Sequence, residues 1–272
     1  MTLSFNQRLA HICDEKKNRL CIGLDIDPDR FPPGRNTSLD GMETFAKEVI
    51  DGTIEFCPVY KPNFAFFERY GSRGYTILER IVDYISGRAI IIADAKRGDI
   101  GNTSRQYARA ILETMGCDAI TISPYMGQDA IEPFLTDTKK GVFVLAITSN
   151  NGAAEIQNNE NDAMPLYERI IQIVCKLNKG DNLGLVIGST KADMMENIRK
   201  LSVGLSWLVP GVGAQGGDLH KSVSISNNNG LGIINISRGI LYAGNGSMIE
   251  IIDAAKHYTE KIREIVCNPI SC

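Results

Sequence analysis

The stretch IIADAKRGDIGNT, residues 91–103, begins as an apolar run and then carries four charged residues within six positions. Burying a charge costs free energy unless it is paired, so we expect these carboxylates and cations to pair with one another. Asp94 and Lys96 are two residues apart, which places their side chains on the same side of a strand. We therefore interpret the stretch as a buried strand that ends in a charged site.

Seven further segments repeat the apolar part of this pattern. They are short, rich in Val and Ile and almost continuously apolar, as expected of strands that are buried on both faces. The predicted strands are 20–25, 57–62, 88–94, 117–122, 142–147, 183–188, 206–210 and 231–236. Amphipathic stretches with helical spacing alternate with them, at 40–55, 74–86, 103–115, 164–178, 190–201 and 246–266.

Alternating strands and helices imply parallel strands joined by right-handed crossovers. Eight such units in about 250 residues match the number of units and the length that are typical of a (β/α)8 barrel. We therefore predict an α/β protein in which residues 1–272 form a single (β/α)8 TIM barrel domain. The alternative is an open, doubly wound sheet. Against it, no G-x-G-x-x-G follows the first strand and no internal linker divides the chain.

Composition and charge limit the partners that the protein is expected to have. Of the 272 residues, 43% are apolar and 22% are charged, as in ordinary globular proteins. A net charge of −3 without any Lys/Arg run argues against a nucleic-acid or membrane partner. The N-terminus lacks the apolar core of a signal peptide, and no apolar stretch is long enough to span a membrane. The seven cysteines are odd in number and form no C-x-x-C pair, so we expect a cytoplasmic protein.

Polar residues stand at the ends of six of the predicted strands or in the loops that follow them. A lone aspartate at a strand end is more often a helix cap than a catalyst. In a barrel, however, the carboxyl ends of all strands meet at one rim, and their convergence there indicates function. The residues are Asp25, Lys61, Asn63, Asp94, Lys96, Thr148, Ser149, Pro210, Gly211, Gln215, Ser237 and Arg238.

The residue types at this rim limit its chemistry. The three histidines, His11, His220 and His257, lie outside the motifs, so we expect neither a His-based triad nor a His-ligated metal. A lysine among carboxylates keeps its charge, which suits a proton donor or an electrostatic stabiliser and not a Schiff-base nucleophile. The alternative is a structural, salt-bridged turn in which Asp99 caps a helix.

Two glycine-containing loops late in the chain form a second candidate site. PGVGAQGGD, residues 210–218, leads into a helix, and SRG, residues 237–239, ends the last strand. Glycines let backbone N–H groups approach an anion, and a helix N-terminus adds a favourable dipole. Barrels commonly bind phosphate at this place, so with Gln215 and Arg238 we expect a phosphomonoester site. A simple tight turn is the alternative.

The pattern D-x-K-R-G-D-I-x-x-T, from Asp94 to Thr103, resembles that of the orotidine 5′-phosphate decarboxylase family. The resemblance implies decarboxylation of orotidine 5′-phosphate to uridine 5′-phosphate in pyrimidine biosynthesis, with no cofactor and no metal. It covers nearly the whole chain, with the similar segments in barrel order. They are GLDIDPD (23–29), YKPNFAFFERYGSRG (60–74), AITSN (146–150), VPGVGAQGGD (209–218) and ISRGI (236–240).

The resemblance also implies roles for the charged residues. Lys96 looks like the proton donor to C6 after carbon dioxide leaves, and Asp94 looks like the carboxylate set against the substrate carboxylate. Lys61 and Asp25 resemble the members of the same charged network that contact the ribose. A preorganised ammonium beside C6 fits this reaction, because decarboxylation leaves a carbanion there without an adjacent carbonyl to accept its electrons.

Further positions resemble the residues that bind the pyrimidine nucleoside monophosphate. Thr148 and Ser149 resemble the pair that contacts the pyrimidine, and Gln215 with Arg238 resembles the phosphate site. Some relatives have an additional arginine shortly after the Pro-Gly of the seventh strand, whereas Gly213 stands near that place here. The phosphate site is therefore expected to depend more on Arg238 and on backbone N–H groups.

Three residues beyond the third strand resemble those that reach into a neighbouring subunit's site: Asp99, Ile100 and Thr103. The resemblance thus implies a homodimer with shared active sites, in which Asp99 belongs to the partner's catalytic array.

Two other functions remain open from the sequence. Metal-dependent hexulose-phosphate synthases share this fold and hold a divalent ion among carboxylates, but Lys61 and Lys96 place cations in the gaps between the acids here. The second alternative is a non-catalytic nucleotide-binding barrel in which the charged array is only a structural salt-bridge network.

Overall fold

The computed structural model describes residues 2–158, 164–189, 192–213 and 216–267. Its eight strands close into one barrel in the order of the sequence, and every neighbouring pair is parallel. The predicted (β/α)8 barrel is therefore confirmed. The strands are β1 (Leu20–Leu24), β2 (Val59–Pro62), β3 (Ile90–Arg97), β4 (Ala119–Ile122), β5 (Gly141–Ile147), β6 (Leu183–Ile187), β7 (Ser206–Val209) and β8 (Gly232–Ile236).

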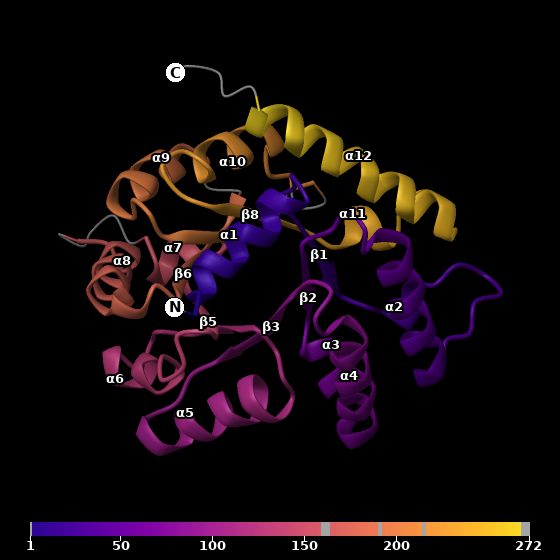
Figure 1. Cartoon of the computed structure of the whole chain (residues 1–272), viewed down its shortest axis with the longest axis horizontal. Coiled ribbons are helices and arrows are strands. Elements are labelled where there is room, and N and C mark those ends of the chain that lie inside the picture. Colours follow the sequence, from indigo (N-terminus) through magenta and orange to yellow (C-terminus); the bar gives the residue numbers. More distant parts are fainter. Residues whose placement is uncertain (1, 159–163, 190–191, 214–215, 268–272) are drawn as a thin grey trace.

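Helices surround the barrel, as the ring of ribbons in Figure 1 shows. The longer ones are α1 (Phe5–Glu15), α2 (Leu39–Thr53), α4 (Gly71–Ile85), α5 (Gly101–Ala108), α8 (Leu166–Leu177), α9 (Ala192–Leu201), α10 (Leu219–Ser226) and α12 (Met248–Cys267). Short helices and turns fill the loops: η1 (Pro28–Arg30), α3 (Ala65–Glu68), η2 (Arg109–Thr114), α6 (Gln128–Ile131), η3 (Glu132–Phe134), α7 (Ala153–Ile156), η4 (Asn178–Gly180) and α11 (Arg238–Leu241).

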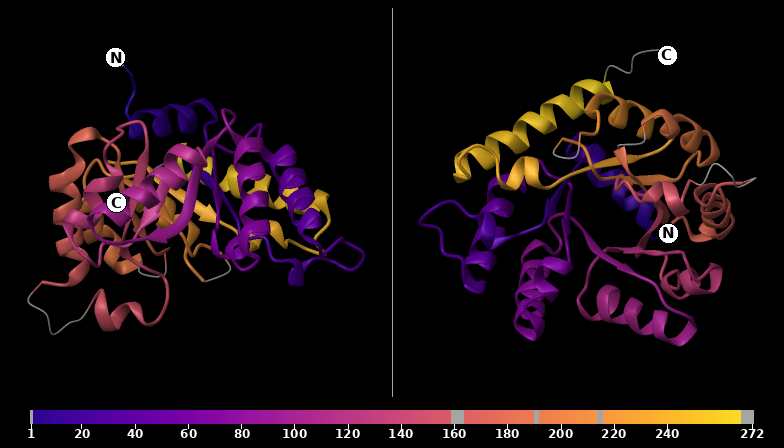
Figure 2. Two further views of the ribbon diagram at one scale, coloured as in Figure 1. Left: turned by 90° about the horizontal axis from the view of Figure 1, so that it is seen from below. Right: turned by 180° about the vertical axis from the view of Figure 1, so that it is seen from behind.

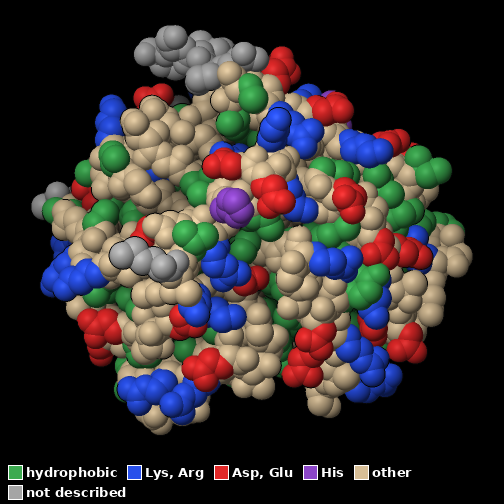
Figure 3. Space-filling view, in the orientation of Figure 1, with side chains coloured by type: hydrophobic (Ala, Val, Ile, Leu, Met, Phe, Trp, Pro, Cys, Tyr) green, Lys and Arg blue, Asp and Glu red, His purple; other side chains and the backbone are tan. Residues whose placement is uncertain are grey.

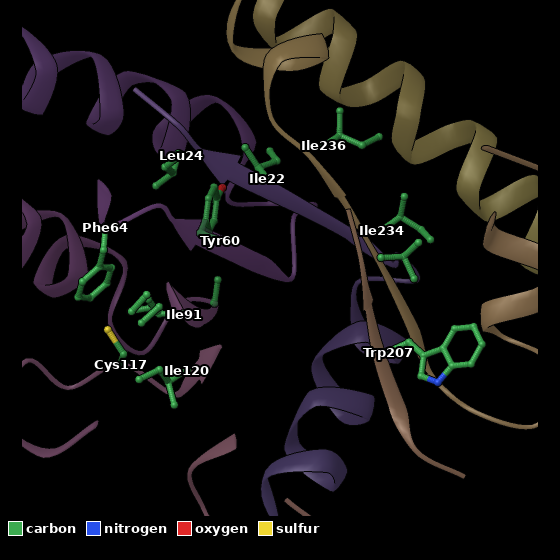
Figure 4. Close-up of a cluster of buried hydrophobic side chains, with 14 of the residues drawn as sticks. Ile22, Leu24, Tyr60, Phe64, Ile91, Cys117, Ile120, Trp207, Ile234 and Ile236 are labelled. Carbon is green, nitrogen blue, oxygen red and sulfur yellow. The ribbon is translucent and has the colours of Figure 1, made fainter. Parts of the chain in front are cut away.

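The outward faces of the strands form the larger hydrophobic core, because alternate strand residues point towards the helices. In β1 and β8 these residues are Ile22, Leu24, Ile234 and Ile236, all buried, and Figure 4 shows them in this layer. Burying an aliphatic side chain of this size contributes about 1.5–3 kcal/mol, which explains why the strands read as continuous apolar runs. None of the helices in the described part of the chain is both long and apolar enough to cross a membrane.

The predicted helices agree with the observed ones to within a few residues, with two differences. The predicted helix 103–115 is α5 followed by a π-helical segment, η2. The segment after β5, for which no helix was predicted, contains the single-turn helix α7. In addition, the sequence analysis did not identify α1, which precedes the first strand.

Helix α1 closes the amino-terminal end of the barrel. Ser4 and Gln7 start the helix with a reciprocal capping box. Phe5 and Leu9 then enter the smaller core, which fills the barrel interior. The Phe5 ring meets Phe143 of β5 edge to face, with centroids 6.0 Å apart. In the left view of Figure 2, α1 lies across one end of the barrel.

Charges of both signs are interspersed over the face that carries α1, which Figure 3 shows. Ion pairs near this end include Arg8–Asp118 at 2.7 Å and Arg19–Asp14 at 2.6 Å. This arrangement agrees with the small net charge of the sequence.

Candidate active site

The inward face of the barrel changes from apolar to polar towards the carboxyl ends of the strands. In β2, Val59 lies in the interior core, whereas Lys61, two residues on, lines a cavity. In β3, Ile92 and Asp94 repeat this change. The cavity has a volume of about 420 Å³. It is lined by Asp25, Lys61, Asn63, Asp94, Lys96, Thr121, Leu145, Thr148, Ser149, Asn150, Val186, Leu208, Pro210, Gly211, Val212, Asn235, Ser237, Arg238 and Gly239.

Asp94 is held between two lysines at the centre of this cavity. Lys61 Nζ lies 2.7 Å from Asp94 Oδ2, and Lys96 Nζ lies 2.5 Å from Asp94 Oδ1. The Lys61 and Asp94 side chains are only 4% and 11% exposed, whereas that of Lys96 is 51% exposed. The buried Lys61 and Asp94 side chains are therefore held in place, and the Lys96 ammonium faces the open cavity.

The electrostatics keep the buried Lys61 and Asp94 pair charged. Burial by itself would lower the pKa of Lys61, but the Asp94 and Asp25 carboxylates outweigh it and raise that pKa above its ordinary value. Burial would likewise raise the pKa of Asp94, and the two lysines instead hold it well below its usual range. The Lys61 ammonium and the Asp94 carboxylate thus coexist as an ion pair near neutral pH.

A bulge at the end of β3 determines where Lys96 points. Ala93 pairs with Ile120 of β4 and Arg97 pairs with Ile122, so three residues of β3 lie opposite Thr121 alone. Lys96 has a φ of +46°, in the left-handed region that is unfavourable for a side chain such as lysine. The predicted simple strand alternation therefore does not explain how Asp94 and Lys96 meet; a local backbone irregularity does.

Arg97, the next residue of the motif, does not line the cavity. Its guanidinium donates to the Ala95 carbonyl at 3.0 Å, forms an ion pair with Glu68, and lies over the Phe64 ring. Arg97 thus fastens the end of β3 to the segment that follows β2.

Asp25 supplies a second carboxylate to the cavity. Its Oδ1 atom is buried and has no hydrogen-bond partner among the described residues. Its carbonyl oxygen accepts from the Tyr242 hydroxyl at 2.9 Å, which fixes the backbone after β1. A buried acceptor without a donor is costly, so Asp25 is suited to receive a hydroxyl group from a ligand.

The loop after β5 brings Thr148 and Ser149 to the cavity wall. The Thr148 amide donates to Gln157 Oε1 at 2.8 Å, and the Thr148 hydroxyl donates to Asn150 Oδ1 at 2.6 Å. Leu145, at the end of the same strand, gives this side of the cavity an apolar surface. A flat ring with polar edges fits between such groups.

The loops after β7 and β8 form the opposite wall, to which Pro210, Gly211 and Arg238 belong. Arg238 is exposed, and its side chain forms no ion pair within the described ranges. Gly213 has a φ of +77°, and a Cβ there would lie 3.0 Å from the Tyr258 hydroxyl, so this position needs glycine. Gln215 lies outside the described residues.

Asp99, Ile100 and Thr103 are not among the residues that line the cavity of their own chain. The Asp99 carboxylate accepts from the Ile100 amide at 2.8 Å, and no side chain caps the N-terminus of α5. The alternative in which Asp99 caps a helix is therefore wrong for α5. Ile100 is 62% exposed.

The cavity also contains residues that the sequence analysis did not single out. Thr121 of β4 and Asn235 of β8 are buried polar side chains in the cavity wall. Val186 and Leu208 form an apolar part of the wall. These residues could have been found from the strand alternation. Each of them either points into the barrel interior or lies two positions after a residue that does.

A second hollow, of about 660 Å³, lies away from the charged groups between the loops 32–36 and 245–247. Arg35 lines it, but its charge is already paired with Glu48 at 2.7 Å. Within the described ranges, no three His, Cys, Asp or Glu side chains gather as a metal site. The functional site is therefore assigned to the charged cavity at the barrel mouth.

The arrangement can stabilise an anion at two separate places. Lys96 presents an ammonium group 2.5 Å from the Asp94 carboxylate, and Arg238 presents an exposed cation on the far wall. Glycines around Arg238 allow backbone approach. A ligand with an anionic reacting centre at one end and a phosphate at the other matches both places.

Comparison with known proteins gives a consistent result. The family described as Orotidine 5′-phosphate decarboxylase / HUMPS matches residues 18–248. A Dehalococcoides mccartyi protein named orotidine 5′-phosphate decarboxylase is 41% identical over 270 residues, 97% of each chain. A Natronomonas pharaonis protein of the same name is 44% identical over 251 residues, which are 91% of this chain and 92% of the other. The solved structure of Leishmania donovani OMP decarboxylase superposes with a TM-score of 0.83 at 33% identity, covering 98% of this chain and 100% of that one.

Proposed function

The chain belongs to the Orotidine 5′-phosphate decarboxylase / HUMPS family, and we propose that it is the carboxy-lyase that converts orotidine 5′-phosphate to uridine 5′-phosphate in pyrimidine biosynthesis. The observation that carries this proposal is the position of Asp94, held between Lys61 and Lys96 at the mouth of the barrel. That cluster supplies both charges that the reaction needs.

Lys96 acts as the proton donor in this proposal. Cleavage of the bond between C6 and the carboxylate releases carbon dioxide and leaves the electron pair on C6. The Lys96 ammonium stabilises that charge and then transfers a proton to C6, which leaves a neutral amine that solvent reprotonates. Asp94 keeps the ammonium charged and oriented, and Lys61 keeps Asp94 ionised.

The remaining lining residues bind the rest of the nucleotide. Asp25 accepts from the ribose hydroxyls and Lys61 donates to them, Thr148 and Ser149 contact the pyrimidine, and Arg238 binds the phosphate. Pro210 shapes the wall beside the phosphate site. Binding energy from the remote phosphate can organise the charged cluster around the reacting carbon.

The proposed reaction needs no metal or cofactor. A hexulose-phosphate synthase places a divalent ion between carboxylates, whereas here Lys61 Nζ occupies the position against Asp94 at 2.7 Å. Its buried ammonium already supplies the positive charge that an ion would provide.

An absorbance assay tests the activity directly. Purified protein should consume orotidine 5′-phosphate at the same rate with and without a strong chelator such as EDTA. A rate that falls on chelation and returns with a divalent ion would favour the metal-dependent alternative. Tight binding of uridine 5′-phosphate without any turnover would favour the non-catalytic nucleotide-binding barrel.

The proposal includes a homodimer with shared active sites, in the cytoplasm. Ile100, Tyr125 and Met126 support it, because they are 62%, 81% and 50% exposed and lie in the neighbouring loops after β3 and β4. These two loops touch, since a Cβ at Gly98 would lie 2.9 Å from the Ser123 carbonyl. Burying such side chains against a second copy would carry Asp99 and Thr103 towards the partner's cavity.

Mixed dimers test the shared site. Lys96→Ala and Asp99→Ala chains should each be inactive alone, but their hybrids contain one intact site and one doubly damaged site. With random exchange half of the dimers are hybrids, so activity should recover to about a quarter of wild type. No recovery, once subunit exchange is verified by labelled chains, would place Asp99 in its own chain's site.

A further inference from the structure

We propose that Thr121 is a positioning residue for the reaction: its hydroxyl locks the bulge of β3 that aims Lys96 and Asp94. The inference rests on the proposed decarboxylase function and adds a residue to its machinery. Thr121 is buried in β4 and forms part of the cavity wall next to the charged cluster.

At the bulge, β3 loses regular backbone hydrogen bonds to β4, and another acceptor has to replace them. Three residues of β3 lie opposite Thr121, so the amides of Ala95 and Lys96 face one residue instead of a continued strand ladder. The Thr121 hydroxyl oxygen accepts from both amides, at 3.1 Å from Ala95 N and 3.0 Å from Lys96 N. One side-chain oxygen thus replaces two backbone acceptors.

The same hydroxyl also reaches the reacting cluster. It donates its proton to Asp94 Oδ1 at 3.1 Å. That oxygen is the one in contact with Lys96 Nζ, whereas Lys61 is bound to Oδ2. The hydroxyl therefore uses two acceptor sites and one donor, which is its full hydrogen-bonding capacity.

These three bonds join the backbone of Lys96 to the carboxylate that its own side chain contacts. Lys96 has its backbone in the left-handed region, at φ +46°, a conformation that persists only where the surroundings hold it. Without the hydroxyl, the bulge can relax and carry the ammonium away from Asp94. Lys61 lies on β2 and Arg238 begins α11, so nucleotide binding should persist.

Two substitutions separate the hydroxyl from the rest of the side chain. Thr121→Val keeps the shape and removes the hydroxyl, whereas Thr121→Ser keeps the hydroxyl and removes only a methyl group. We expect Thr121→Val to lower kcat roughly 10- to 100-fold, since displacement of a catalytic group by about 1 Å has effects of this size. The dissociation constant of uridine 5′-phosphate should change by no more than about threefold, and Thr121→Ser should stay within about threefold of wild type in kcat.

Several outcomes would overturn the inference. They are a Thr121→Val kcat close to wild type, an equal loss in Thr121→Ser, or a parallel loss of uridine 5′-phosphate binding, which would indicate general collapse of the site. If Thr121→Val does not fold, Thr121→Ala gives the same test without a buried methyl group beside the two amides.

A crystal structure of the hydroxyl-free variant gives a readout that does not depend on activity. We expect Lys96 Nζ to move away from Asp94 Oδ1, and an unchanged contact would overturn the inference even if kcat falls. Failure of the wild-type protein to decarboxylate orotidine 5′-phosphate would instead overturn the proposed function and leave this structural result to decide the role of Thr121.

Discussion

The two ends of the barrel are built from the same strands but differ in what fills them. At the amino-terminal end, Phe5 and Leu9 of α1 pack onto the interior core. At the carboxyl-terminal end, the next inward positions are occupied by groups such as Lys61 and Asp94. A two-residue step along β2 or β3 therefore separates a closed apolar layer from an open charged one. In the right-hand view of Figure 2, α1 lies on the far side of the barrel, away from the viewer.

The amino-terminal end of the barrel contributes mainly to stability, and the carboxyl-terminal end carries the groups for the reaction. The apolar end gains free energy from burial and needs no polar partner, so its residues can be judged by volume alone. The charged end is favourable only as a network, because each buried charge depends on its neighbours. Substitutions at the two ends should accordingly change different measured quantities.

The largest effect is expected at the charged end. Lys96→Ala should lower kcat by at least about 10³-fold, because the ammonium acts on charge that is present mainly in the transition state. The free energy of unfolding should change by less than about 1 kcal/mol, since the side chain is half exposed and Asp94 keeps Lys61. Steady-state kinetics and urea unfolding measure the two quantities, with Lys176→Ala on α8 as a matched control. A loss of only about tenfold, ~1.4 kcal/mol, would contradict the proton-donor role.

The opposite pattern is expected at the apolar end. Leu9→Ala should lower the free energy of unfolding by about 2–5 kcal/mol, because it removes a fully buried side chain of α1 from the interior core of the barrel. The kcat of the folded enzyme should stay the same. Leu201→Ala, at an exposed leucine, is the control and should change stability by no more than about 0.5 kcal/mol. A large fall in kcat for Leu9→Ala would show that the two ends are coupled.

Replacing Arg238 should weaken substrate binding more than it slows the chemical step. Arg238→Ala should raise KM for orotidine 5′-phosphate roughly 10- to 100-fold, as loss of a charged hydrogen bond to phosphate implies. Turnover of orotidine, which lacks the phosphate, should be nearly unaffected. Arg8→Ala, at the other end of the barrel, provides the control. Equal losses with both substrates would mean that Arg238 supports the structure and does not bind phosphate.

The smallest effect concerns pH. Burial by itself would raise the pKa of Asp94, but the effect of Lys61 and Lys96 is larger and lowers that pKa in the folded chain below its ordinary value of 3.8. At a pH above 3.8 the ionised Asp94 therefore stabilises the folded state. This contribution is lost as the pH falls. Compared with pH 7, the stability difference between wild type and Asp94→Asn should shrink by about 0.6 kcal/mol at pH 3.5 and stay constant between pH 7 and 5. Urea unfolding at these values checks it, and a change already at pH 6 would contradict the assignment.

The sequence predicted the scaffold well because the strands of a parallel barrel are buried on both faces. Each appears as a continuous apolar run, and every predicted strand overlaps an observed one. Helix α1 was missed because it lies outside the alternation of strands and helices, although Ser4 and Gln7 have the spacing of a capping box. The rim residues could be predicted from strand ends alone, and nine-residue loops such as 210–218 could be recognised by their glycines.

By itself, the sequence determined the order of the strands along the chain and the residue types at their carboxyl ends, because periodicity and strand ends are local properties. That the strands close into a barrel and do not form an open, doubly wound sheet is seen in the structure. Only the tertiary structure decided how those residues meet. The register shift that turns Lys96 towards Asp94 depends on β4, and the hydroxyl that secures it comes from Thr121, 25 positions away from Lys96 in the chain. The exclusion of Asp99 from its own cavity likewise follows from the turn after β3. Contacts between separate strands depend on backbone geometry, which no single segment of sequence contains.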